Sequence, residues 1–261
     1  MIIIGEKLNS SIPSIFDLMK EKNTEAIKQI ALNQENSGAN FLDINTAIFR
    51  DQEFEMLEYV LGIVLENTKC GIMLDSPSPA VIEKAIKLIP GREVIINSIT
   101  LQDRIKELLP VVKLYKSGVV CLPIDADGIP KTVEKRVENS LKLVEILTAE
   151  GIEKDRIYID VLAETLAVDN EAAKTTIDSI AALRKAEPDI HIICGVSNVS
   201  FGLPKRVNIN TAFLTTAVYA GLDSGILDIT NEQIQSTIYI AEMLSGKDEF
   251  CMEYLGYIRS R

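Results

Sequence analysis

The sequence predicts an α/β protein with the (β/α)8 barrel fold, built as a single domain by residues 1–261. Three observations predict this fold class. Eight short apolar runs recur along the chain, most are apolar at successive positions, and each is followed by a helix-compatible segment. Continuous apolar runs are typical of parallel strands buried on both faces, and their alternation with helices is typical of βαβ units. No Pro-, Gly- or Ser-rich linker divides the chain, which favours one domain with a large core.

The expected strands are separated by segments long enough for the helical crossovers that parallel strands require. They are residues 2–4, 41–44, 71–74, 94–96, 119–122, 157–159, 190–194 and 225–229.

Helix signals lie between these strands. Asn23 and Thr24 precede an amphipathic segment that ends near Gly38, and Ser78 offers an N-cap directly before Pro79. These signals predict one helix after the first strand and another after the third.

Two later helices are predicted with less regular boundaries. Thr100 precedes a helical pattern that stops near Gly118, and Pro110 should kink this helix or end its first half. Thr230 with Gln233 resembles a capping box, which predicts a helix ending near Gly246.

Polar side chains follow every apolar run. An aspartate such as Asp75, placed before Ser76 and Pro77, is explained by itself as a cap or turn residue. Recurrence changes that interpretation, because the carboxyl ends of barrel strands converge on one mouth where binding groups project. The residues concerned are Glu6, Asn9, Asp43, Asn45, Asp75, Asn97, Asp125, Asp127, Asp160, Ser197, Asn198 and residues 228–230.

A mouth rich in Asp and Asn suits a ligand with several N–H donors and a few acceptors. A pterin fits this description, because its 2-amino and N3–H groups form an edge from which a carboxylate accepts two hydrogen bonds. Other heterocycles and sugars would suit the same residues, so composition leaves the ligand open.

Charge and composition restrict the partners. The formal net charge is −11, which disfavours nucleic acid, and no apolar run approaches the roughly 18 residues that span a bilayer. We therefore expect a cytoplasmic protein that contacts neither nucleic acid nor membrane. Cys70, Cys121, Cys194 and Cys251 lie far apart without CxxC spacing, which predicts free thiols in a reducing compartment.

Other chemistries find little support. His191, the only histidine, begins its strand and should face the end of the barrel opposite Asp75. The chain lacks a GxSxG elbow, which disfavours a Ser-His hydrolase, and it lacks His and Cys clusters, so no metal is expected although carboxylate-bound magnesium stays open.

Two charged segments allow two interpretations each. Asp125, Asp127 and Glu134 nearly match the spacing of a calcium loop, but Pro123 replaces the first ligand, so a solvated turn is expected. Lys205 and Arg206 could meet anionic groups of a ligand, or be solvated surface charges.

Six motifs carry a family resemblance. MIIIGEKLN, FLDIN, IMLDS, VIINS, IYID and GVSNVSFGLP resemble the methyltetrahydrofolate:corrinoid protein methyltransferases, pterin-binding relatives of dihydropteroate synthase. The resemblance spans nearly the whole chain. It implies a (β/α)8 barrel, a homodimer, and methyl exchange between tetrahydrofolate and a corrinoid (cobalamin) carried by a partner protein.

The resemblance also implies roles for residues. Asp75, Asn97 and Asp160 match pterin-binding positions, and Asn198 matches the catalytic asparagine. Gly195 and Ser197 belong to the same loop and should shape the floor beside the pterin. A supporting shell is expected from Glu6, Asn9, Asp43 and Asn45.

The direction of transfer rests on finer similarities. The GEKLNSSIP opening is similar to relatives of catabolic demethylation systems, which implies transfer from methylcorrinoid to tetrahydrofolate. Phe201 and Gly202 replace a polar pair found in many acetogen-type relatives, so one side of the cavity should form fewer hydrogen bonds.

Three alternatives stay open. A dihydropteroate synthase is opposed by the missing GGESTRPG-like loop and the missing late SR…H arrangement, and a Schiff-base aldolase by Asp160 where a lysine is expected. A pterin-binding module without catalysis needs the same pocket but no turnover.

Overall fold

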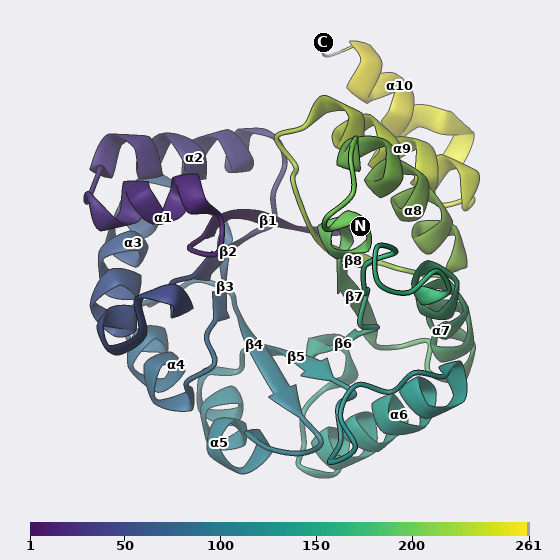
Figure 1. Cartoon of the computed structure of the whole chain (residues 1–261), viewed down its shortest axis with the longest axis horizontal. Helices are drawn as coiled ribbons and strands as arrows, with labels where there is room; N and C mark the ends of the chain where they lie inside the picture. Colours follow the sequence, from purple (N-terminus) through teal and green to yellow (C-terminus); the bar gives the residue numbers. More distant parts are fainter. Residues whose placement is uncertain (260–261) are drawn as a thin grey trace.

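The structure, a computed structural model, describes residues 1–259. Within this part of the chain, parallel strands close a barrel in sequence order, which confirms the predicted fold class (Figure 1). The strands are β1 (Ile2–Asn9), β2 (Phe41–Asn45), β3 (Gly71–Asp75), β4 (Val94–Thr100), β5 (Gly118–Leu122), β6 (Ile157–Asp160), β7 (His191–Gly195) and β8 (Ser224–Leu227).

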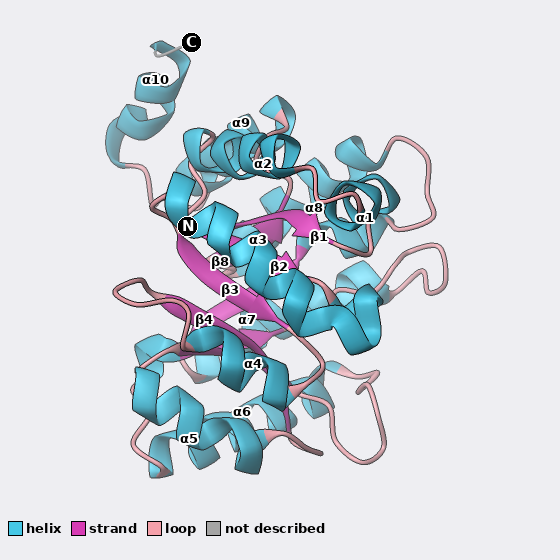
Figure 2. Ribbon diagram, turned by 90° about the vertical axis from the view of Figure 1, so that its left-hand side faces the viewer, coloured by secondary structure: helices cyan, strands magenta, loops and turns pink. Residues whose placement is uncertain are grey.

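Helices surround the barrel and bury its outer face, except for the last helix, which has no buried residue and contacts the helix before it (Figures 1 and 2). They are α1 (Pro13–Lys20), α2 (Thr24–Asn36), α3 (Glu53–Asn67), α4 (Pro79–Ile86), α5 (Ile105–Tyr115), α6 (Val133–Ala149), α7 (Ala172–Ala186), α8 (Arg206–Ala220), α9 (Glu232–Leu244) and α10 (Met252–Arg259). Short 3-10 turns are η1 (Ala47–Gln52), η2 (Lys154–Arg156), η3 (Val196–Ser200) and η4 (Glu249–Cys251). In residues 1–259, the helices are too short or too polar to cross a membrane.

All the expected strands are present, with small shifts at their ends. β1 continues to Asn9 and β4 to Thr100, each past an irregularity in its register with the next strand, between Gly5 and Leu8 and between Asn97 and Ile99. β8 ends at Leu227, two residues before the predicted end.

The first helix signals are confirmed. The Asn23 side chain accepts a hydrogen bond from the amide of Ala26, and that of Ser78 accepts one from the amide of Val81. Gly38 follows α2 with φ of +100°, a left-handed conformation that favours glycine. The predicted ends of these helices are therefore physically explained.

The predicted start of the fifth helix was wrong. Thr100 belongs to β4, and α5 begins at Ile105. Pro110 lies within α5 without dividing it. Its missing N–H would have bonded the carbonyl of Lys106, and both residues are exposed, so water can satisfy that carbonyl.

The predicted capping box at Thr230 was also wrong. Asn231 caps α9, and its side chain accepts hydrogen bonds from the amides of Gln233 and Ile234 at 3.0 and 3.3 Å. Thr230 instead donates its hydroxyl hydrogen bond to Asp228 at 2.6 Å. The predicted end holds, because Gly246 has φ of +74° just after α9.

The interior of the barrel is divided into an apolar layer and a polar ring. The apolar layer consists of Ile4, Phe41, Met73, Ile95, Val120, Tyr158 and Ile193. Side chains alternate along a strand, so the residue two positions further points to the same interior. Those positions hold Glu6, Asp43, Asp75, Asn97, Leu122, Asp160 and Gly195. The strands thus deliver mostly polar groups to the mouth directly above a packed layer.

Candidate functional site

Four polar residues form a continuous row across the first four strands. Asn9 pairs in register with Asn45, Asn45 with Asp75, and Asp75 with Asn97. The Nδ2 atom of Asn45 donates a hydrogen bond to Oδ2 of Asp75 over 2.7 Å. Adjacent residues in register point to the same face, so this row lines one side of the mouth.

Asp75 has no structural role as a helix cap. Ser78 caps α4, and the amide of Ser78 is bonded by the hydroxyl of Ser76. Burial raises the pKa of Asp75, while the bond from Asn45 and the nearby Arg104 oppose that rise. The carboxylate therefore stays available to a ligand.

Asp160 occupies the mouth at the end of β6. Its Oδ1 atom accepts a hydrogen bond from the amide of Leu162 over 2.7 Å. Burial raises the pKa of Asp160 to about 6, and the Leu162 amide and Arg136 act against this rise. The carboxyl group thus titrates close to neutral pH.

The loop after β7 brings Gly195, Ser197 and Asn198 to the mouth. Ser197 donates a hydrogen bond from Oγ to Oε1 of Glu6 on β1, over 2.8 Å. Asn198 is exposed and lies against Gly195, since a Cβ atom added to Gly195 would come within 2.9 Å of Asn198 Nδ2. Glycine at this position lets the Asn198 amide lie over the strand end.

A second group of carboxylates lies deeper in the barrel. Asp43 is only 2% exposed, and its Oδ1 atom has no hydrogen-bond partner among residues 1–259. Burial, reinforced by the charges of Asp75 and Glu6, holds the pKa of Asp43 well above its usual range. Burial also raises the pKa of Glu6. The raised pKa and the unpartnered Oδ1 atom make Asp43 a buried carboxyl group whose polar capacity is not used within residues 1–259.

The strand-end residues predicted a mouth of carboxylates and amides, but the structure also places cationic side chains there. Arg104 donates to the carbonyl of Ser76 at 2.5 Å, and Lys7 forms an ion pair with Asp228 at 2.7 Å. Arg206 donates to the carbonyl of Ser197 at 2.7 Å. Of these, only Arg206 was singled out from the sequence. Arg104 gives no local signal, because its contact is made across a 28-residue separation.

The mouth has a small cavity of its own between β1, β7 and β8. Its volume is about 180 Å³, and its polar lining includes Glu6, Lys7, Ser197, Arg206 and Asp228. Lys205 is exposed beside it, at the start of α8. Phe201 lies on the same loop, 67% exposed, with its ring 5.8 Å from the Arg206 guanidinium.

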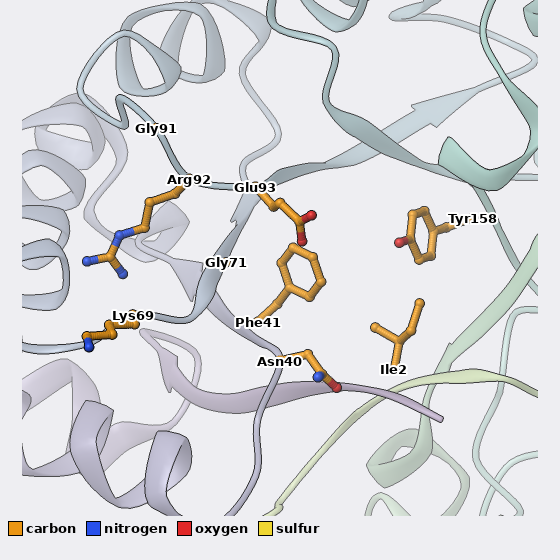
Figure 3. A pocket seen from close by; sticks show the side chains of 9 residues that line it. All are labelled: Ile2, Asn40, Phe41, Lys69, Gly71, Gly91, Arg92, Glu93 and Tyr158. Atoms are coloured by element: carbon orange, nitrogen blue, oxygen red, sulfur yellow. The ribbon is translucent and has the colours of Figure 1, made fainter.

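A larger cavity, of about 650 Å³, lies at the opposite end of the barrel (Figure 3). Phe41 and Tyr158 face into it, whereas the guanidinium of Arg92 points away from both rings. Arg92 donates to the carbonyls of Leu65, Thr68 and Cys70, so it caps the end of α3. Arg92 therefore has a structural role in the wall of this cavity, and the cavity lies far from the polar ring at the mouth.

His191 begins β7 at that same end, as the sequence predicted. Its Nδ1 atom is 3.1 Å from Asp223, and its ring stacks on Tyr158 with centroids 4.5 Å apart. His191 therefore has a structural role at the barrel rim.

The calcium-like segment is a turn held by the protein's own donors. Asp125 accepts hydrogen bonds from Asn139 at 2.9 Å and from the amide of Asp127 at 3.0 Å, and it lies 3.4 Å from Lys135. These contacts occupy the carboxylate that would serve as a ligand. Within residues 1–259, His, Cys, Asp and Glu side chains form no group suited to a metal ion. The four cysteines are free thiols, as predicted.

The profile of the family described as pterin binding enzyme matches residues 5–228. The chain therefore belongs to the family of pterin-binding enzymes. It is similar to the methylcorrinoid:tetrahydrofolate methyltransferase of Eubacterium limosum, with 33% identity over 259 residues, which cover 97% of this chain and 94% of that relative.

A second relative is the methionine synthase of Mycobacterium leprae. It is 31% identical over 241 residues, which cover 87% of this chain but 20% of that much longer protein. Among solved structures, dihydropteroate synthase from Xanthomonas albilineans in complex with 7,8-dihydropteroate superposes with a TM-score of 0.69 at 18% identity, covering 94% of this chain and 92% of that chain. The enzyme from Yersinia pestis gives 0.67 at 18% identity, with coverage of 94% and 93%. At such low identity these two structures show the fold.

Proposed function

We propose that this protein is a methyltransferase that exchanges a methyl group between a corrinoid protein and N5 of tetrahydrofolate, running from methylcorrinoid to tetrahydrofolate in vivo. The observation that carries the proposal is the coincidence of a full-length match to a methylcorrinoid:tetrahydrofolate methyltransferase with a polar ring at the barrel mouth. Neither the sequence match nor the polar ring would by itself support this reaction, because (β/α)8 barrels support many chemistries.

The pterin would be held by the carboxylates and amides at the barrel mouth. Asp75 and Asp160 supply acceptors for the N–H edge, and Asn97 can donate as well as accept. Asn45 fixes the orientation of Asp75 through the 2.7 Å hydrogen bond. Gly195 and Ser197 shape the wall from which Asn198 projects. This arrangement would place N5 toward the open side of the mouth.

The reaction is a methyl transfer with a balanced displacement. N5 uses its lone pair to form the new N–C bond and loses its proton, and the electron pair of the broken cobalt–carbon bond stays with cobalt. The corrinoid supplies the methyl group and this electron-accepting chemistry when its carrier protein docks. The protein's contribution is to orient the pterin and to exclude alternative positions.

Asn198 would act at N5. Its amide oxygen can accept a hydrogen bond from protonated N5 and so stabilise positive charge there during transfer in either direction. Asp43, with its raised pKa, and Glu6, bound to Ser197, would hold the loop and the deeper polar groups in place beneath the pterin. Lys205 and Arg206 would meet anionic parts of the folate tail or the corrinoid.

The proposal includes partners and location. A corrinoid protein is the partner that the reaction requires, and we propose that the enzyme acts as a cytoplasmic homodimer. No nucleic acid or membrane enters the reaction. The negative formal charge of −11 fits a small-molecule and protein-directed function.

Single-turnover methyl exchange tests the proposal. Cob(I)alamin with methyltetrahydrofolate, and methylcobalamin with tetrahydrofolate, are followed by the cobalt absorption change. Wild type should catalyse exchange, whereas Asn198→Ala should lose rate by about 100-fold while still binding folate. Folate binding without exchange, using free cobalamin or a carrier protein, would indicate a non-catalytic pterin-binding module. Condensation of pterin pyrophosphate with p-aminobenzoate would indicate dihydropteroate synthase instead.

A further inference from the structure

Arg136 is a buried arginine with an unusual set of partners. It belongs to α6, which follows β5, and is 2% exposed. Its guanidinium donates to the carbonyls of Pro130, Val161 and Leu162 at 3.0, 2.7 and 3.0 Å. It also reaches Glu164 at 2.9 Å. Two of these carbonyls belong to the residues that immediately follow Asp160.

Leu162 has a backbone conformation that needs support. Its φ is +58°, in the left-handed region that bulky L residues rarely adopt. Such conformations persist when surrounding contacts enforce them, and they gather at functional sites. The contact from Arg136 to the Leu162 carbonyl provides this enforcement on one side of the residue.

The same residue contacts the site on its other side. The amide of Leu162 donates to Oδ1 of Asp160 over 2.7 Å, a bond that the left-handed turn makes possible. Arg136, Leu162 and Asp160 therefore form one chain of contacts from a helix behind the barrel to the mouth.

We infer that Arg136 is a positioning residue for Asp160: it holds the loop after β6 in the conformation whose amide orients the Asp160 carboxylate toward the substrate. This inference deepens the proposed function and rests on it for the identity of the substrate. Arg136 would not touch the pterin, because its donors are directed at the loop backbone, at Glu164 and at Thr176.

The geometry explains why arginine occupies this position. A guanidinium offers five donors in a planar fork, whereas a lysine ammonium is a compact charge on a flexible stem. Three carbonyls from two loops match the fork. Glu164 balances the charge and also pairs with Lys131 at 2.7 Å. Asp169 is a further acidic group whose charge acts on Arg136.

Two variants of Arg136 separate the effect of its planar hydrogen-bonding geometry from the effect of its positive charge. Arg136→Lys keeps the positive charge and loses the fork, while Arg136→Gln removes the charge. The matched control is Arg92→Lys at the opposite end of the barrel, because Arg92 also donates to three backbone carbonyls. The control should lower thermal stability and leave folate affinity unchanged.

The first readout does not depend on any substrate. In the free protein, amide exchange of Leu162 and the carboxyl ¹³C titration of Asp160 are measured by NMR. Both Arg136 variants should accelerate exchange at Leu162, and Arg136→Gln should also move the Asp160 titration to higher pH, because a nearby cation favours the carboxylate. The Arg92→Lys control should change neither quantity.

The second readout is functional. Arg136→Lys should reduce the single-turnover methyl-transfer rate by about 100-fold, the effect of misplacing a positioning group by about 1 Å. In an Asp160→Asn background the same change should have little further effect, because the positioned group has been altered already. Should Arg136→Gln fail to fold, Arg136→Lys carries the test alone.

Unchanged Leu162 amide exchange in a folded Arg136→Lys protein would overturn the inference, as would an unchanged Asp160 titration in a folded Arg136→Gln protein. If these NMR changes occur but wild type neither binds folate nor transfers methyl groups, the positioning role stands and the proposed function fails. The two failures are therefore distinguishable.

Discussion

Asn45 and Asp75 are register partners on β2 and β3, and the side-chain amide of one donates to the carboxylate of the other over 2.7 Å. Burial raises the pKa of Asp75, and the hydrogen bond from Asn45 opposes that rise while it orients the carboxyl group. In the proposed site, this pairing would orient the strand-end carboxyl group of Asp75 toward the ligand.

Asn45→Leu should therefore weaken folate binding. The substitution removes the donor while keeping a side chain of similar size, so the pKa of Asp75 rises and the pH at which binding is half-maximal increases. Calorimetric titration with tetrahydrofolate across pH 5 to 8 measures the change. Asn33→Leu, on the exposed face of α2, serves as the control and should leave the curve in place. An unaltered binding curve in Asn45→Leu would remove Asp75 from the site.

Asp160→Asn should change how stability depends on pH. The folded pKa of Asp160 is raised to about 6 from an ordinary value of 3.8, so its carboxyl favours folding below about pH 4 and loses this contribution as pH rises through 6. Between pH 4 and 7, the free energy of unfolding of wild type should therefore fall by roughly 2 kcal/mol relative to that of Asp160→Asn, allowing for water at the mouth. Urea unfolding of both proteins checks the difference. Parallel curves would contradict it.

Gly195→Ala should impair transfer more than binding. The added Cβ atom would come within 2.9 Å of Asn198 Nδ2, so the amide must leave its position over the strand end. We expect the single-turnover rate to fall by roughly 10- to 100-fold, with a smaller loss of folate affinity. Stopped-flow measurement of the cobalt absorption and a parallel binding titration give both quantities. Equal losses would show that Asn198 acts in binding alone.

Gly71→Ala should destabilise the protein without altering the site. A Cβ atom there would lie 2.4 Å from the Phe41 ring, so the ring would have to leave its packed position. We expect a loss of about 1–3 kcal/mol in the free energy of unfolding. Gly62→Ala, within α3 and with open space around it, should instead gain about 0.5–1 kcal/mol. Activity per folded molecule should stay unchanged in both.

The sequence predicted the barrel and the polar strand ends because both are repeated local patterns. Each apolar run and each following carboxylate or amide is visible within a few residues, and parallel topology places those ends together. Asp75, Asn97 and Asp160 could be found in this way. Their roles toward a pterin stay predictions.

The residues that sequence reasoning missed act over long separations. Arg104 and Arg136 contact loops 28 and 26 residues away, and nothing near either residue indicates these partners. The misplaced cap at Thr230 has a different cause. Thr230 and Asn231 are adjacent and both suit an N-cap, and the bond from Thr230 to Asp228 decided between them.

The two interior levels have a consequence for how such a protein changes over time. Met73, Ile95 and Tyr158 belong to the packed layer, and Asp75, Asn97 and Asp160 stand two residues beyond them. In the proposed site, the residues that stabilise the barrel and the residues that would select the ligand therefore occupy different positions of the same strands. A new ligand needs new side chains at the second set of positions, and the barrel beneath can stay as it is.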